Sequence, residues 1–91
     1  MTHAFVLIEC DREAMAHLGG ALADIEGVSE AYSVAGEWDF VAILHLPRHE
    51  QLADIVTGRI GGLEGVVRTQ TMVAFEVFSQ HDLEALFSVG E

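Results

Sequence analysis

Two short segments, THAFVLIEC at residues 2–10 and FVAILHL at residues 40–46, constrain the fold most because each is apolar on both faces. Strands that are covered on both sides have continuous apolar runs, whereas strands with one solvated face alternate between apolar and polar residues. Asp11 follows the first segment and Pro47 follows the second. We therefore predict that both segments are central strands of one sheet.

Two helices and two further strands complete the predicted pattern. Asp11 is the predicted N-cap of a helix that runs to about residue 25, with a buried stripe of Met15, Leu18, Leu22 and Ile25. Within it, Gly19-Gly20 indicates close backbone packing. A second helix follows Pro47 and ends at Gly61-Gly62, with a stripe of Leu52, Ile55, Val56, Ile60 and Leu63. Residues 28–35 and 65–78 are predicted strands, the latter from its period of two.

The order β-α-β-β-α-β predicts an α+β fold, a ferredoxin-like sandwich in which an antiparallel four-stranded sheet carries both helices on one face. The other face is predicted to be bare and apolar, so we expect a dimer that forms through the sheets. Parity leaves open whether Val41/Ile43 or Phe40/Ala42/Leu44 lie on that face. We assign residues 1–78 to this domain and residues 79–91 to a C-terminal extension that could form a short helix.

Charge and composition exclude several classes of partner. The net charge is −11 with no lysine and four separated arginines, so direct nucleic-acid binding is not expected. No apolar run is long enough to span a membrane, and no signal peptide is evident, which predicts a cytoplasmic protein without a membrane partner. The single cysteine, Cys10, cannot form an internal disulfide, and its acidic neighbours Glu9 and Asp11 are expected to raise its pKa.

No motif supports catalysis, a cofactor or a metal site. His45 and His49 have roughly the spacing of two metal ligands, but Pro47 separates a predicted strand from a predicted helix between them. No partner is evident for His3, His17 or His81. Nucleophile elbows and phosphate-binding loops are also absent from the sequence, so we predict that the chain is not an enzyme.

The stretch Gly36-Glu37-Trp38-Asp39 between the second and third strands is the strongest candidate site. Glycine can adopt positive φ, aspartate can accept hydrogen bonds from backbone amides, and the only tryptophan stands between them. Taken alone, these are ordinary hairpin residues. Likewise, Thr69-Gln70-Thr71 alone is an ordinary strand sequence.

Together, two patterns resemble the effector domain of the Lrp/AsnC (feast/famine) transcription regulators, also called the RAM domain. They are Val28-x3-Tyr32-x-Val34-x-Gly36-x2-Asp39-Phe40 and Leu63-x-Gly65-Val66-x2-Thr69-x-Thr71. The resemblance implies the fold above, dimers joined through their sheets, rings of eight chains, and an amino acid bound between dimers. Residue by residue it implicates Gly36, Asp39, Thr69 and Thr71 in binding, with Glu37, Trp38 and Gln70 as neighbours.

The family's helix-turn-helix is absent before the first strand, so we expect a stand-alone effector domain. It would either bind an amino acid itself or join rings with full-length regulators. One rival class is an ACT-like regulatory domain, which would have a glycine turn where this chain has Glu9-Cys10-Asp11-Arg12. Another is an enzyme of the dimeric α+β barrel class, with a pocket lined by polar strand residues such as His45, Arg68, Gln70 and Glu76.

Overall fold

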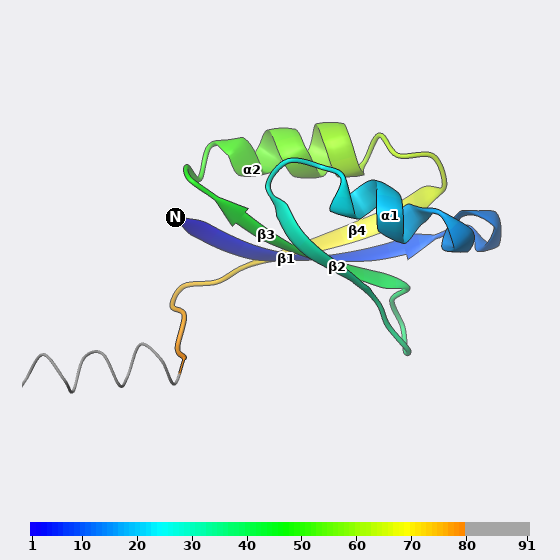
Figure 1. Cartoon of the computed structure of the whole chain (residues 1–91), viewed down its shortest axis with the longest axis horizontal. Coiled ribbons are helices and arrows are strands. Elements are labelled where there is room, and N and C mark those ends of the chain that lie inside the picture. Colours follow the sequence, from blue (N-terminus) through cyan, green and yellow to red (C-terminus); the bar gives the residue numbers. More distant parts are fainter. Residues whose placement is uncertain (80–91) are drawn as a thin grey trace, which may run out of the picture.

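Four antiparallel strands form one sheet with the spatial order β2-β3-β1-β4 (Figure 1). A computed structural model describes residues 1–79 of the chain. The two strands predicted from their continuous apolar sequences are central and have the predicted bounds. The strands are β1 (Thr2–Cys10), β2 (Val28–Ser33), β3 (Phe40–Leu46) and β4 (Val66–Val73).

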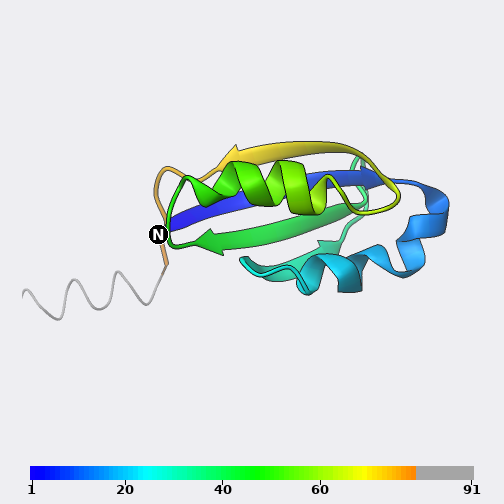
Figure 2. The same cartoon turned by 90° about the horizontal axis from the view of Figure 1, so that it is seen from above.

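The helices cover one face of this sheet and leave the other bare (Figures 1 and 2). They are the 3-10 helix η1 (Arg12–Ala16), the α-helices α1 (Leu18–Ala23) and α2 (Gln51–Ala53), and the π-helix η2 (Asp54–Ile60). Alternate residues of the two central strands are buried under the helices: Ala4, Val6, Ile8, Phe40, Ala42, Leu44 and Leu46. The predicted ferredoxin-like α+β architecture is confirmed.

The first helical region differs from the single long helix that the sequence predicted. It breaks at His17, whose φ of −127° is not helical, and α1 ends at Ala23. Ala14, not Met15, is buried on the core side, and it lies so close to Gly65 that a Cβ atom at position 65 would collide with the Ala14 methyl group. Asp11 occupies the N-cap position without a side-chain cap hydrogen bond.

Gly19 explains part of the predicted close packing. A Cβ atom at this position would lie 3.2 Å from a ring carbon of Phe40, whereas Gly20 has open space around it. Leu18, Leu22 and Ile25 are buried as predicted. The glycine pair therefore serves one close contact, between α1 and the start of β3.

The second helical region starts at Gln51, four residues after Pro47. The Gln51 side-chain oxygen accepts a hydrogen bond from the Arg48 backbone N–H at 3.1 Å, as in a capping box. Leu52, Ile55 and Ile60 of the predicted stripe are buried, and Val56 and Leu63 pack at the edge of the core. The helix ends before Gly61, as predicted.

The last strand ends at Val73, so the prediction that it extends to Phe78 is wrong. β4 pairs with β1, and the final contacts place Val73 opposite Ala4 and join the Ala74 N–H to the His3 carbonyl. Beyond this bond the chain leaves the sheet, so residues 75–78 add no further pairs to β1. The predicted second strand is also shorter than expected and ends at Ser33. Beyond Ser79, the predicted C-terminal helix lies outside the described residues.

The register identifies the side chains of the bare face. Directly opposed residues lie on the same face, and Val41 opposes Leu7 and Tyr32, while Ile43 opposes Phe5. The bare face therefore contains Val41 and Ile43 rather than the Phe40/Ala42/Leu44 set. Its apolar members are Phe5, Leu7, Tyr32, Val41, Ile43 and Met72.

The edge of the bare face that β4 provides is more polar than predicted. Arg68 opposes Glu9, Gln70 opposes Leu7, and only Met72, opposite Phe5, adds an apolar side chain there. Phe5, Tyr32 and Met72 are 38%, 48% and 45% exposed. The apolar surface is thus concentrated on the two central strands, β1 and β3, with Tyr32 of β2 and Met72 of β4 at its margins.

The segment after β4 leaves the sheet on the side away from the helices (Figure 1). In this segment Phe75 is fully exposed, and Val77 and Phe78 are exposed by more than half. Among residues 1–79, no helix is long and apolar enough to cross a membrane.

Gly65→Ala is expected to destabilise the fold more than Gly36→Ala. Both glycines have positive φ, 95° and 118°, so either alanine would cost about 1–2 kcal/mol of backbone strain. At Gly65 the new methyl group would also collide with the Ala14 side chain, which adds about 1–3 kcal/mol, whereas Gly36 has open space. Urea unfolding of the two variants measures the difference. Equal losses would show that the Ala14 contact does not limit this position.

Candidate ligand-binding site

The β2–β3 corner is a tight loop at one end of the sheet. The Val34 N–H donates to the Asp39 carbonyl at 3.0 Å and closes the hairpin. Gly36 adopts φ of 118° within the loop, a conformation that other residues rarely adopt. Glu37 is exposed, and Trp38 and Asp39 are half-buried. The predicted hairpin corner is therefore present, with its glycine in the conformation that the sequence suggested.

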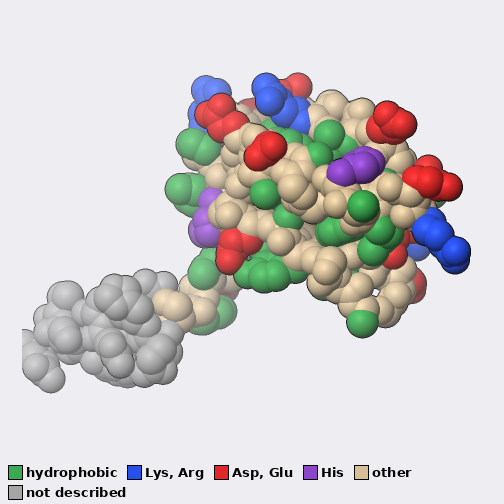
Figure 3. All heavy atoms as spheres, turned by 45° about the vertical axis from the view of Figure 1, so that its right-hand side comes forward, with side chains coloured by type: hydrophobic (Ala, Val, Ile, Leu, Met, Phe, Trp, Pro, Cys, Tyr) green, Lys and Arg blue, Asp and Glu red, His purple; other side chains and the backbone are tan. Residues whose placement is uncertain are grey.

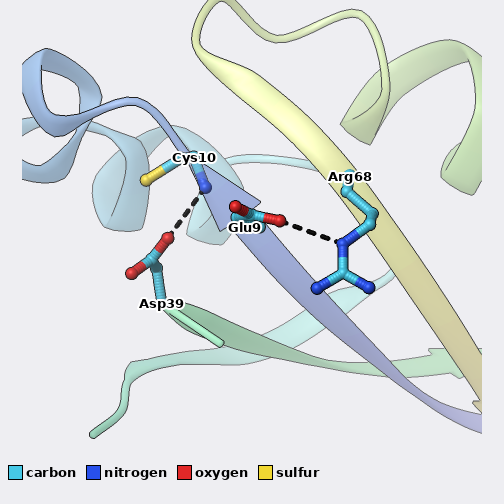
Figure 4. Close-up of polar contacts among 4 residues, drawn as sticks. All are labelled: Glu9, Cys10, Asp39 and Arg68. Atoms are coloured by element: carbon cyan, nitrogen blue, oxygen red, sulfur yellow. Dashed lines mark hydrogen bonds and ion pairs between the residues drawn. The ribbon is translucent and has the colours of Figure 1, made fainter. Parts of the chain in front are cut away.

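Asp39 is bonded to β1 rather than to its own turn. Its carboxylate Oδ2 accepts a hydrogen bond from the Cys10 backbone N–H at 2.9 Å, and its own backbone N–H donates to the Ile8 carbonyl at 2.9 Å (Figure 4). These bonds connect residues about thirty positions apart in sequence. The corner is thus fixed to the end of a central strand, which limits its freedom to move.

Arg68 brings a third strand to the same end of the sheet. Its Nε donates to the Glu9 carboxylate at 2.9 Å (Figure 4), and its guanidinium carbon lies 4.2 Å from the centre of the Trp38 ring. The ion pair is about half exposed, so by itself it stabilises the fold little. The cation–π contact contributes about 0.5–1 kcal/mol at an exposed site. The main consequence of this cation–π contact is that Trp38 is held beside Arg68 of β4.

The predicted residues of β4 do not converge with the corner within one chain. Thr69 opposes Ile8 and Thr71 opposes Val6, so both threonines lie on the helix-covered face, whereas Gln70 opposes Leu7 on the bare face. β4 lies two strands away from β3, about 9–10 Å at the usual strand spacing. Thr71 instead lines an open groove of about 440 Å³ beside α2 and η2.

Sequence reasoning missed Cys10 and Arg68, which contact the corner, and Glu9, which forms an ion pair with Arg68. The sequence offers little sign of these contacts. They form between residues on different strands, so they depend on the register between β1 and its neighbours. Arg68 stands directly before the Thr69-Gln70-Thr71 motif, and Glu9 and Cys10 directly precede the predicted helix cap. The site that the structure assembles is therefore Trp38 and Asp39 with these three residues.

Cys10 lies beside the Asp39 carboxylate, and its pKa is raised. Partial burial is the largest cause of this shift. The negative charges of Asp39 and Asp11 come next, and a hydrogen bond to Asp39 and the charge of Glu9 contribute less. The acidic neighbours predicted from the sequence therefore contribute, and the folded chain adds Asp39. Because only the thiolate is a strong nucleophile, a raised pKa leaves Cys10 unreactive at neutral pH.

A second concave region lies at the opposite end of β3. It has a volume of about 620 Å³ and is bounded by the α1–β2 turn, the end of β3 and the helices α2 and η2. Arg48 and Arg59 line it together with the acidic residues Glu26, Glu50 and Asp54. It does not include any residue of the corner, so it is separate from the candidate site.

Metal-binding clusters are not evident in the part of the chain that the structure describes: no three His, Cys, Asp or Glu side chains gather there. His45 lies at the end of β3 and His49 precedes α2, so the two stand on either side of the strand-to-helix turn.

These features define a small α+β domain of the ferredoxin-like class, with polar groups gathered at the β2–β3 corner. The family model for the Lrp/AsnC ligand binding domain matches residues 3–83, and the chain belongs to this family. The family and the matched homologues are transcription regulators. Family membership thus favours the resemblance found in the sequence over the ACT-like and enzyme alternatives.

Similar proteins come from archaea and bacteria. An uncharacterised HTH-type transcriptional regulator of Pyrococcus furiosus is 36% identical over 77 residues, which are 81% of this chain and 51% of that protein. The chain therefore spans about half the length of the curated relatives it matches.

Two solved structures extend the comparison. A Thermus thermophilus protein superposes with a TM-score of 0.82 at 44% identity, over 88% of this chain and 100% of that chain. A feast or famine regulatory protein from Mycobacterium tuberculosis, complexed with L-methionine, has a TM-score of 0.75 at 30% identity. That alignment covers 88% of this chain and 54% of the other.

Proposed function

We propose that the chain is a non-enzymatic regulatory domain that binds a small amino acid and works as an oligomer. It either senses the amino acid itself or modulates the assembly of full-length Lrp/AsnC-type regulators. Membership of the Lrp/AsnC ligand-binding family supports this role, as does the L-methionine bound to the M. tuberculosis relative. The observation that carries the proposal is the fixed corner, where Asp39 is bonded to the end of β1.

The proposed ligand contacts follow from the two charges of a free amino acid. Its ammonium group needs acceptors, which the carboxylates of Asp39 and Glu37 offer, and its carboxylate needs donors. Backbone amides near Gly36 and the hydroxyl groups of Thr69 and Thr71 are the proposed donors. Trp38 and Gln70 are the neighbours that we propose set the side-chain preference.

Two copies of the chain are needed to complete such a site. Asp39 and Thr69 lie two strands apart in one chain, and Thr69 and Thr71 lie on the helix-covered face of the sheet. We therefore propose that the corner of one copy meets the β4 threonines of another. This requirement agrees with an amino acid bound at an interface between dimers, with a ring such as an octamer as the proposed assembly.

The bare face is the proposed contact within each dimer. Its apolar side chains lie on the face of the sheet that no helix covers (Figures 1 and 2), and a second copy is the simplest partner for such a face. Residues 1–78 would form the effector domain, and residues 79–91 would extend from it. Direct DNA contact is not part of the proposal, because the chain has no lysine and acidic side chains lie beside the arginines that Figure 3 shows.

Thermal denaturation of the full chain with each common amino acid, together with light scattering, tests the proposal. We expect at least one amino acid to raise the melting temperature, because a ligand that binds only the folded state stabilises it. We also expect a particle mass of at least a dimer. A monomer at micromolar concentration whose melting temperature no amino acid changes would overturn the proposal.

A further inference from the structure

His3 and His45 form a cross-strand pair that the linear sequence does not reveal. His3 of β1 stands directly opposite His45 of β3, and their rings lie 4.4 Å apart between centroids at an interplanar angle of 69°. Both follow the alternation of the bare face, since their neighbours Ala4, Leu44 and Leu46 are buried under the helices. His45 is exposed and His3 half-buried.

Backbone hydrogen bonds show that this pair belongs to the closer of the two antiparallel pair types. The His45 N–H donates to Gly27 on the β2 side, and the His3 carbonyl accepts from Ala74 on the β4 side. The backbone groups of His3 and His45 therefore bond to the outer strands and not to each other, which defines a non-hydrogen-bonded pair. Opposed residues of this type have Cα atoms only about 4.5 Å apart, so their side chains can converge on one point.

The spacing of the rings matches two ligands of one metal ion. With nitrogen bound at 2.0–2.1 Å, a ring centroid lies about 3.2 Å from the metal. Two such rings at 90° have centroids about 4.5 Å apart, and at the tetrahedral angle about 5.2 Å. The observed 4.4 Å is close to these values, so both imidazole rings are within reach of one ion.

We propose that His3 and His45 chelate one divalent transition-metal ion, with water in the remaining coordination positions. The ion class is that of borderline divalent metals such as Cu²⁺, Ni²⁺ and Zn²⁺, for which imidazole is a suitable ligand. The net charge of −11 raises the local concentration of cations around the chain. The pair lies at the end of β3 away from the corner, so this site is independent of the proposed amino-acid site.

Calorimetric titration of the tag-free full chain with Cu²⁺ and with Ni²⁺ tests the site. We expect one ion bound per chain in the wild type. His3→Gln and His45→Gln should each weaken binding by at least about tenfold, since even the loss of a partner outside the coordination shell costs roughly 10–100-fold. The matched controls are His49→Gln and His17→Gln, which remove exposed histidines outside the pair.

Electron paramagnetic resonance of the Cu²⁺ complex provides a second measurement. Wild type and both control variants should show two nitrogen ligands, and the two pair variants should show fewer. Circular dichroism verifies that every variant folds. Equal affinities in wild type and in folded His3→Gln and His45→Gln variants would overturn the proposal, and so would binding that His49→Gln or His17→Gln removes.

Discussion

Ile43→Asp is expected to convert the proposed dimer into a folded monomer. Ile43 lies in the middle of the bare face, between Glu30 and Phe5 on the neighbouring strands. A dimer with two-fold symmetry would bury two such carboxylates without partners. At about 2 kcal/mol each, this raises the dissociation constant by about a thousandfold. Light scattering or sedimentation across a dilution series measures the change.

Leu44→Asp and Thr57→Asp are the matched controls. Leu44 is fully buried under the helices, so its replacement should unfold the chain rather than dissociate it. Thr57 is exposed on η2, and aspartate there should change neither assembly nor fold. An Ile43→Asp variant that assembles like wild type would show that the bare face is not the dimer contact.

Asp39→Asn is expected to abolish amino-acid binding while the fold persists. Asparagine keeps a side-chain oxygen that can accept the Cys10 N–H, so the bond to β1 is retained and stability should fall by less than about 1 kcal/mol. The variant loses the negative charge that would bind the ligand's ammonium group. Loss of a charged partner in a closed site costs roughly 2–5 kcal/mol, or about 30- to 5,000-fold in affinity.

Asp39→Ala separates the two roles of this side chain. It removes both the charge and the acceptor, so it should lose affinity to the same extent and also about 1–2 kcal/mol of stability. Titration calorimetry with the amino acid that gives the largest thermal shift measures the affinities of both variants. Unchanged affinity in folded Asp39→Asn would mean that the carboxylate only attaches the corner to β1.

The central strands could be predicted from sequence because burial on both faces and clear terminating residues agree there. Asp11 and Pro47 mark the ends of two apolar runs, and β1 and β3 have the predicted bounds. The end of β4 could not be predicted, because the period of two continues past Val73 although the pairing with β1 does not. The close packing of Gly65 against Ala14 joins residues some fifty positions apart in sequence and has no local signal.

The candidate site was predictable only in part. The Gly36 conformation and the position of the corner follow from local sequence. The Asp39–Cys10 bond and the Glu9–Arg68 pair depend on which residues stand opposite one another across strands, and this register has no local signal. The alternation of strand residues places Thr69 and Thr71 on one face and Gln70 on the other. For the same reason of register, the sequence could not show that the threonine face is the one that the helices cover.

The end of β1 joins several loops through two successive amides. The Cys10 N–H is bonded to Asp39 of the corner, and the next amide, that of Asp11, donates at 2.8 Å to the Gly65 carbonyl in the loop before β4. η1 begins at the following residue, Arg12. The corner, the loop before β4 and η1 are consequently mechanically linked at a single point of the backbone. Any displacement of one of them must either move the other two or break one of these bonds.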